Sequence, residues 1–244
     1  MRFSSPLVPG TLLLREKRFL AHVRLDDGRT VIAHTNNTGG MRGCSTPGSR
    51  VWLSPANNPK RKLKWTWELI EVGDSPASPT PVLAGINTLL PNKLAHEALL
   101  AGVIPDLTGY DRVRTEVKYG SERSRIDLLL ERGESENTER CWVEVKNVTL
   151  VGPNGRGAFP DAVTERGRKH LRELAEQVTL GDRAVLLWIV QRSDIQSVEP
   201  ADSIDPKYGK ELRRGAALGV EIIAMQADVT TEGIELVREL PVRL

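Results

Sequence analysis

Two apolar stretches of strand length lie on either side of a polar break near the middle of the chain. Residues 124–130 read Ser-Arg-Ile-Asp-Leu-Leu-Leu, and residues 141–147 read Cys-Trp-Val-Glu-Val-Lys-Asn. Residues 131–140 between them carry charges, a glycine and an asparagine but no apolar residue, which is typical of a turn or short loop. Leucine, β-branched and aromatic residues at this length favour strands. The pattern therefore predicts a β-hairpin over residues 124–148.

Alternation along the second strand of this hairpin places Glu144 and Lys146 on one face, and Asp127 on the paired strand can share that face. Two carboxylates about 4 Å apart repel by about 4 kcal/mol at an effective dielectric of 20. A divalent cation reverses that repulsion, and a lysine beside it can stabilise charge on a phosphate or orient a water molecule. The three residues therefore indicate either metal-dependent phosphodiester cleavage or a structural ion pair across the strands.

The first third of the chain predicts short strands at residues 12–25, 29–33, 50–54 and 61–72, with Asp26-Asp27-Gly28 as a hairpin turn. Four or five short strands separated by turns are typical of a small barrel. Residues 73–81 are rich in proline and serine and predict a linker. We therefore expect two domains, residues 1–80 and 81–244.

The remaining chain alternates strands and helices, which predicts an α/β domain with a parallel crossover. Asp161 is expected to cap the second helix. Gln191 ends a strand at the edge where open α/β sheets place ligands, so it either contacts the site or simply ends the strand. The expected elements are a helix at 91–101, a strand at 114–119, a loop at 151–160, a helix at 162–178, a strand at 183–191, a helix at 206–219, a strand at 220–226 and a strand-like tail at 234–244.

Basic residues gather in two places. Trp65 and Trp67 alternate with leucines, which favours packing inside the barrel over stacking on bases. The neighbouring basic residues are candidates for contact with nucleic-acid phosphates, or belong to a solvated edge strand. The same two interpretations hold for a basic face of the 162–178 helix, opposite its apolar stripe. The candidates are Lys60, Arg61, Lys62 and Lys64 in the barrel and Arg166, Lys169 and His170 on the helix.

The net charge of +2 conceals an asymmetry, because residues 1–80 hold 12 Lys/Arg against 6 Asp/Glu and the rest holds 22 against 26. This division suits a phosphate-binding module joined to a domain with acidic metal ligands. The two cysteines, Cys44 and Cys141, lack zinc-site spacing. Residues 1–10 show no apolar signal-peptide core, and the longest apolar run, 184–190, is too short to span a bilayer. We expect a cytoplasmic protein with no membrane partner.

Asp127 with Glu144-Val145-Lys146 resembles the PD-(D/E)XK nuclease signature, although Ile126 stands where that pattern has proline. More specifically, the whole chain resembles the sugar fermentation stimulation protein A family. The matching stretches are Lys17-Arg18-Phe19-Leu20-Ala21, Asn58-Pro59-Lys60-Arg61-Lys62, Thr66-Trp67-Glu68-Leu69, Glu116-Val117-Lys118-Tyr119-Gly120, Ser124-Arg125-Ile126-Asp127, residues 144–150 and residues 159–167.

The resemblance implies an N-terminal OB-like barrel and a C-terminal PD-(D/E)XK nuclease-like domain, with a mixed sheet flanked by helices. It also implies binding to DNA without sequence preference. In such a domain Asp127 and Glu144 are expected to hold Mg²⁺ or Mn²⁺ with the backbone carbonyl of Val145, and Lys146 is expected to assist catalysis. Glu97 on the first helix is either a further ligand or an ordinary glutamate at the edge of the apolar face.

We therefore expect a DNA-binding protein with a Mg²⁺-dependent nuclease site. The alternative is a non-catalytic DNA-binding regulator of sugar (maltose) metabolism on a retained nuclease scaffold. RNA is a further possible partner, because an OB barrel accepts several single-stranded ligands. An oligomer is also compatible with the sequence.

Overall fold

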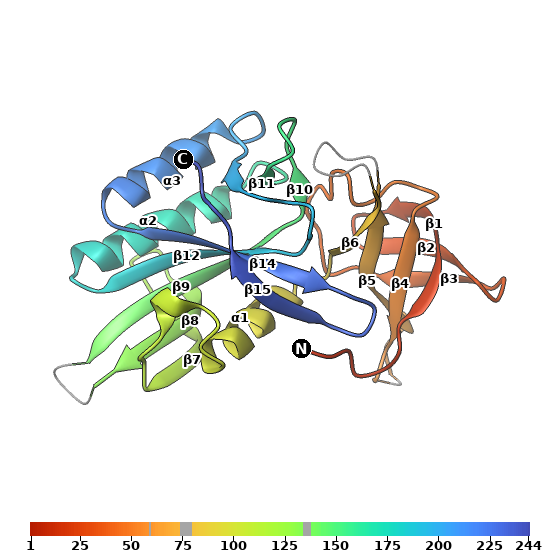
Figure 1. The fold of residues 1–244 in the computed structure, drawn as a ribbon, viewed down its shortest axis with the longest axis horizontal. Helices are drawn as coiled ribbons and strands as arrows, with labels where there is room; N and C mark the ends of the chain where they lie inside the picture. The colour runs from red at the N-terminus through yellow and green to blue at the C-terminus, as the bar shows by residue number, and fades with distance from the viewer. Residues whose placement is uncertain (59, 74–79, 134–137) are drawn as a thin grey trace.

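The computed structural model describes residues 1–58, 60–73, 80–133 and 138–244. Most of the predicted linker at 73–81 and part of the predicted loop at 131–140 lie outside the described residues. Figure 1 shows a β-barrel beside an α/β domain, which confirms the predicted fold class. In the part of the chain that the structure describes, no helix is both long and apolar enough to cross a bilayer.

The barrel consists of a sheet in the order β3-β2-β1-β4-β5-β6, which closes on itself because β3 also pairs with β5. Its core contains Leu12, Val23, Leu53 and Trp67, all fully buried. The sheet extends to Gly85, beyond the boundary predicted at residue 80. The strands are β1 (Val8–Glu16), β2 (Leu20–Leu25), β3 (Thr30–His34), β4 (Arg50–Pro55), β5 (Trp65–Val72) and β6 (Val82–Gly85).

The single strand predicted at residues 12–25 is wrong, because a turn at residues 17–19 divides it into β1 and β2. Lys17 and Arg18 both adopt left-handed backbone conformations, with φ of 49° and 64°. Turns of this kind usually carry glycine, asparagine or aspartate, which tolerate positive φ. Neither residue is of these types, so the turn has no sequence signal.

The strand predicted at residues 61–72 begins only at Trp65. Asn58 folds the preceding segment into a turn, since its side chain accepts a hydrogen bond from the Lys60 amide and its carbonyl accepts one from the Arg61 amide. The basic run at 60–64 therefore lies in a loop rather than on an edge strand. Trp67 is fully buried and Trp65 packs against the same core, so the prediction of barrel packing is confirmed.

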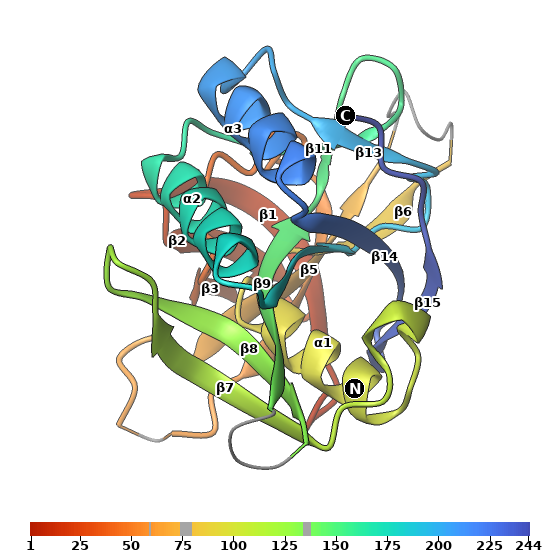
Figure 2. The same cartoon turned by 90° about the vertical axis from the view of Figure 1, so that its left-hand side faces the viewer.

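The α/β domain is a mixed sheet in the order β15-β14-β12-β9-β8-β7, with β12 parallel to β9 and β14. Figure 2 shows α1 on one face and α2 with α3 on the other. A small sheet, β10-β11-β13, lies where a loop was predicted. The elements are α1 (Leu90–Leu100), β7 (Arg112–Tyr119), β8 (Ser124–Arg132), β9 (Glu139–Val148), β10 (Leu150–Val151), β11 (Gly157–Phe159), α2 (Glu165–Thr179), β12 (Arg183–Val190), β13 (Val198–Pro200), α3 (Pro206–Ala217), β14 (Glu221–Val229) and β15 (Ile234–Glu239), with a 3-10 turn at Pro105–Leu107.

Each face of this sheet has its own hydrophobic core, as strand alternation predicts. Val143 and Val145 of β9 pack with α1 residues such as Leu94. Trp142 of the same strand packs on the opposite face with Leu171 of α2. Because both faces of β9 are covered, the polar residues at its C-terminal end are held in a rigid frame.

The cap of α2 differs from the prediction. Thr164 caps the helix by accepting a hydrogen bond from the Gly167 amide, and the helix begins at Glu165. Asp161 was predicted as the cap, but its carboxylate accepts a hydrogen bond from the Met41 amide of the barrel. A β-carbon on Gly39 would lie 2.9 Å from the Asp161 carboxylate, so the absence of a side chain there allows the two domains to approach closely.

Asp205 joins the starts of α2 and α3. It caps α3 at the Tyr208 amide, accepts a hydrogen bond from the Thr164 amide and pairs with Arg168, with its side chain 2% exposed. Burial raises the pKa of Asp205, but these backbone hydrogen bonds and Arg168 outweigh it and hold the pKa below its ordinary value.

We expect Asp205→Ala to reduce the free energy of unfolding by about 2 kcal/mol at pH 7, because a helix cap and an ion pair are lost together. The folded-state pKa is depressed, so this stabilisation is complete above the unfolded pKa of about 3.9 and is lost as the pH falls through the folded value. Urea unfolding at pH 7 and pH 3 checks this. If the free energies of unfolding of variant and wild type differed by the same amount at pH 7 and at pH 3, the charge of Asp205 would not contribute to the stabilisation.

Candidate active site

The predicted hairpin exists, and its hydrogen-bond ladder ends at the candidate site. The strands β8 and β9 are paired from Arg132↔Glu139 to Leu128↔Val143, and the pairing stops one residue before Asp127. There the Asp127 carboxylate accepts a hydrogen bond from the Val145 amide at 2.7 Å. A side chain thus takes the place of a ladder carbonyl, which satisfies a buried donor and fixes the carboxylate in position.

The other oxygen of Asp127 contacts the first helix. Asn92, in the first turn of α1, donates a hydrogen bond to Asp127 Oδ1 at 2.7 Å. Asp127 is therefore held from two sides, by the backbone of β9 and by an amide of α1. Burial, followed by the negative charge of Glu144, raises the pKa of Asp127 above its ordinary value.

Glu144 lies deeper, with its side chain 2% exposed. Its Oε1 atom is contacted by the Lys146 ammonium group and by His170 Nδ1. Burial raises the pKa of Glu144, but Lys146 and His170 outweigh it, so the pKa lies below its ordinary value. The lowered pKa of Glu144 keeps this residue ionised, whereas the pKa of Asp127 is raised.

The second oxygen, Glu144 Oε2, is buried and has no hydrogen-bond partner among the described residues. A buried carboxylate oxygen without a partner is costly unless something else occupies it. The described residues contain no group of three or more His, Cys, Asp or Glu side chains arranged around one point. Mg²⁺, however, uses only one or two carboxylates and takes its other ligands from waters and phosphate oxygens. The donor set therefore fits a hard divalent cation.

These residues lie in a cleft of about 370 Å³ between the two domains. Asp127, Glu144, Val145 and Lys146 line it together, as predicted. The barrel and the interdomain segment supply part of the wall. Other polar lining residues are Asn37, Thr88, Asn92, Asn147, Thr149, Asp161, Thr164 and Arg166.

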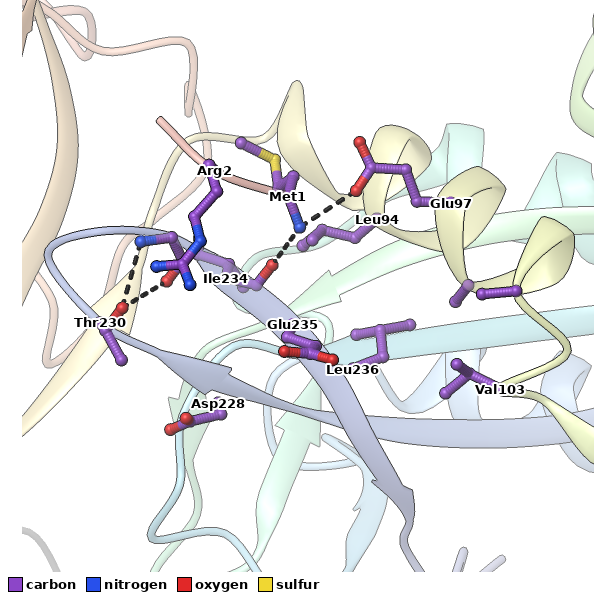
Figure 3. Close-up of a pocket in the computed structure, with 13 residues that line it drawn as sticks. Met1, Arg2, Leu94, Glu97, Val103, Asp228, Thr230, Ile234, Glu235 and Leu236 are labelled. Carbon is purple, nitrogen blue, oxygen red and sulfur yellow. Dashed lines mark hydrogen bonds and ion pairs between the residues drawn. The ribbon is translucent and has the colours of Figure 1, made fainter. Parts of the chain in front are cut away.

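The structure does not bring Glu97 to this cleft. Figure 3 shows it in a separate cavity of about 410 Å³, where it points toward the N-terminus and its Oε2 atom lies 3.0 Å from the Met1 amino group. Glu97 lies five positions after Asn92, which places the two side chains about 140° apart around α1. Of the two interpretations of Glu97, the structure disfavours the metal ligand, and the helix places the Asn92 amide beside Asp127 instead.

The three basic residues of α2 do not share one exposed face. His170 is buried and directed at Glu144. Arg166 lines the cleft and donates a hydrogen bond to His170 Nε2 at 3.3 Å. Because arginine only donates, His170 Nε2 accepts and Nδ1 carries the proton toward Glu144. Lys169 contacts the Glu122 carbonyl instead. Only Arg166 is therefore placed to reach a ligand in the cleft.

The basic residues of the barrel are also divided. Arg61 and Lys62 line a cavity of about 510 Å³ with His34, Asn36 and Leu89. The Arg61 guanidinium is fixed by a 2.9 Å hydrogen bond to Thr66 Oγ1. Lys60 and Lys64 lie in the same loop but outside this lining, as far as the structure describes it.

Gln191 holds a residue that lines the cleft. It is fully buried, and its Nε2 atom donates to Asn147 Oδ1 at 2.7 Å, while Asn147 lines the cleft. Its backbone carbonyl accepts a hydrogen bond from the Gly85 amide of the barrel. Gln191 therefore positions Asn147 and joins the two domains.

Asn37, Thr88 and Asn92 were not predicted as site residues. Each is a neutral polar residue whose place in the cleft depends on how the domains pack, so local periodicity carries no signal for it. Two features of the sequence bear on them: Asn37 lies in the polar, glycine-rich stretch 35–41, and Pro91-Asn92 marks the start of a helix.

A closed OB barrel followed by a mixed α/β sheet with paired carboxylates at one strand end defines the class of this two-domain protein. Two family profiles match the chain: the SfsA N-terminal OB domain over residues 13–78, and the sugar fermentation stimulation protein RE domain over residues 89–233. The chain belongs to the sugar fermentation stimulation protein family.

Curated relatives match along the whole chain. A sugar fermentation stimulation protein homolog of Geobacter metallireducens is 57% identical over 244 residues, covering 100% of both chains. The homolog of Geobacter sulfurreducens is 54% identical over 237 residues, covering 97% of this chain and 96% of its own. The solved structure of Pyrococcus furiosus SfsA in complex with Ca²⁺ has a TM-score of 0.84 at 27% identity, covering 100% of this chain and 98% of its own.

Proposed function

We propose that this protein is a Mg²⁺- or Mn²⁺-dependent nuclease that binds DNA without sequence preference. The observation that carries the proposal is the convergence of Asp127, Glu144 and Lys146 on one cleft, with one oxygen of Glu144 buried and unpartnered among the described residues. Asp127 and Glu144 would hold the metal with the Val145 carbonyl. A metal bound there lowers the pKa of its water and neutralises charge that develops on a phosphate.

The protein's own residues then have separate roles. Asn92 and the Val145 amide hold the Asp127 carboxylate in one orientation. His170 contacts Oε1 of Glu144 and fixes the orientation of the carboxylate, so that Oε2 points to the other side. Lys146 remains within reach of a phosphate in the cleft and is 17% exposed. The similar Pyrococcus furiosus protein was solved in complex with Ca²⁺, and Ca²⁺ and Mg²⁺ both prefer oxygen ligands.

DNA is the proposed substrate because the barrel half of the chain is basic and two of its cations, Arg61 and Lys62, line a cavity. Contacts with phosphates release counterions, so affinity should fall steeply between about 50 and 200 mM salt. A flat salt dependence in fluorescence anisotropy would exclude phosphate contacts as the main source of affinity.

A second candidate function is a DNA-binding regulator that does not cleave. The observation that favours it is that the Lys146 ammonium group already pairs with Glu144, and His170 contacts the same carboxylate, without a metal. Purified protein incubated with supercoiled, linear and single-stranded DNA separates the two functions. Cleavage that requires Mg²⁺ or Mn²⁺ and stops with EDTA supports the nuclease, whereas binding without cleavage under all conditions supports the regulator.

A further inference from the structure

We infer that the β1–β2 turn and His34 form a binding edge for single-stranded nucleic acid, leading the strand into the cleft at Asp127. The residues of this edge, called here the entry platform, are Lys17, Arg18, Phe19 and His34. The inference deepens the proposed function and rests on it for the direction of the strand. Binding to the platform itself requires no cleavage and can be tested without metal.

The backbone of the turn points to a role for its side chains. Lys17 and Arg18 both have positive φ, although neither is a residue type that favours it. An Asn-Gly pair would adopt the same backbone with less strain. The chain instead carries two exposed cations there. Residues with unfavourable backbone angles are retained where the surrounding structure fixes them, and they are often found at ligand-binding sites.

The neighbouring aromatic residues supply a surface for bases. Phe19 is 42% exposed, and its ring lies 6.4 Å from that of His34 at an interplanar angle of 42°. Burial, followed by the charge of Arg61, lowers the pKa of His34, so its ring is neutral at pH 7. Exposed aromatic rings beside cations are what a single strand requires, because bases stack on the rings and phosphates pair with the cations. Trp67 cannot take this role, since it is fully buried.

The platform adjoins the basic cavity of the barrel. His34 lines that cavity together with Arg61 and Lys62. Leu89, which also lines this cavity, is 66% exposed and immediately precedes α1. The cavity therefore offers both cations and apolar side chains, which are the groups that contact the phosphate and the base of a nucleotide.

The platform is also fixed to the wall of the active-site cleft. The Arg15 guanidinium donates to the Arg18 carbonyl at 2.7 and 3.0 Å and to the carbonyls of Asn37 and Gly39 at 2.9 and 3.0 Å. Asn37 lines the cleft that contains Asp127. One side chain thus holds the turn and the cleft wall together, so a strand bound at the turn lies beside the entrance to the cleft.

Hydrogen bonds connect residues that line the barrel cavity with a residue that lines the cleft. Asn36 donates to Asn87 at 3.0 Å, and Thr88 donates to the Asn36 carbonyl at 3.1 Å. Asn36 and Asn87 face the barrel cavity, whereas Thr88 faces the cleft. These hydrogen-bonded residues therefore link the lining of one cavity to that of the other. A duplex buries its base faces in stacking, so the aromatic part of the platform should recognise only unpaired bases.

The first test is Phe19→Ala, measured by anisotropy of labelled oligothymidylate in EDTA. We expect a loss of affinity of at least about tenfold, from the loss of one stacked base, with duplex affinity unchanged. The matched control is Leu14→Ala, because Leu14 is similarly exposed on β1 of the same barrel and should leave both affinities unchanged.

The second test separates charge from backbone strain. The double variant Lys17→Asn with Arg18→Gly keeps the turn with residues that favour positive φ. We expect its melting temperature to equal or exceed that of wild type. Affinity for the single strand should fall by at least about tenfold, and the slope of log affinity against log salt should decrease by about 1.4 for two lost phosphate contacts. Arg24→Ala, an exposed cation elsewhere in the barrel, is the control.

Oligothymidylate and oligouridylate of equal length distinguish DNA from RNA as the strand that binds. Unchanged single-strand affinity in both platform variants would overturn the inference, as would an equal loss for duplex. Because every measurement is made in EDTA, these outcomes are independent of whether the protein cleaves DNA. Failure of the nuclease proposal would instead appear as binding at the platform without any metal-dependent product.

Discussion

Replacing Asp127 with asparagine is expected to reduce Mg²⁺-dependent DNA cleavage by at least about 100-fold. Asparagine has nearly the same shape and can still accept the hydrogen bond from the Val145 amide, but it lacks the charge that attracts a divalent ion. DNA affinity should stay constant or rise, because a negative charge near the phosphates is lost. Initial rates on linear DNA and anisotropy in EDTA measure the two quantities.

The control for this experiment is Asp26→Asn. Asp26 is on the barrel and pairs with Arg50 at the surface, so its removal should leave cleavage unchanged. If Asp127→Asn cleaves DNA as fast as wild type, the assignment of the metal site is wrong. If cleavage and affinity fall together, Asp127 acts in substrate binding and not in metal binding.

Replacing Asp194 with alanine should produce the largest loss of stability. Asp194 pairs with Arg192 at 2.7 Å, and both side chains are about 2% exposed or less. The variant would leave the Arg192 charge buried without its carboxylate partner, although Arg192 would keep its 3.1 Å hydrogen bond to the Thr149 carbonyl. Breaking a buried pair in this way costs about 3–5 kcal/mol. Urea unfolding of wild type and variant at pH 7 measures the difference.

Asp202→Ala provides the comparison. Asp202 and Arg213 form an ion pair at 2.6 Å, but both side chains are nearly half exposed. Solvent screens such pairs, so its loss should cost less than about 1 kcal/mol. Similar losses in the two variants would show that burial does not determine the energy of the Arg192 pair.

The central hairpin could be predicted because its signals are local. Strand alternation relates Glu144 to Lys146 two residues later, and Asp127 lies on the adjacent strand of the same hairpin. The barrel, the α/β domain and the packing of Trp67 also follow from periods of two or 3.6 residues. To predict these features, it is enough to know which face of its own strand or helix each side chain occupies.

Features that depend on three-dimensional packing could not be predicted in this way. A helical wheel placed His170 with Arg166 and Lys169, but α2 packs against the sheet so that His170 contacts Glu144 of β9. The family resemblance left Glu97 as either a ligand or an ordinary glutamate, and the structure places Asn92 of the same helix beside Asp127. The turn at Lys17 lacks the residues that usually mark a reversal of the chain.

Both domains form the walls of the cleft, and this limits how the protein can be divided. The Met41 amide donates to Asp161, and the Gly85 amide donates to the Gln191 carbonyl. An excised C-terminal half would keep the acidic pair but expose it to bulk water on one side, and it would lose these interdomain partners. A shortened form of this chain that is meant to keep the cleft must therefore retain the barrel together with the α/β domain.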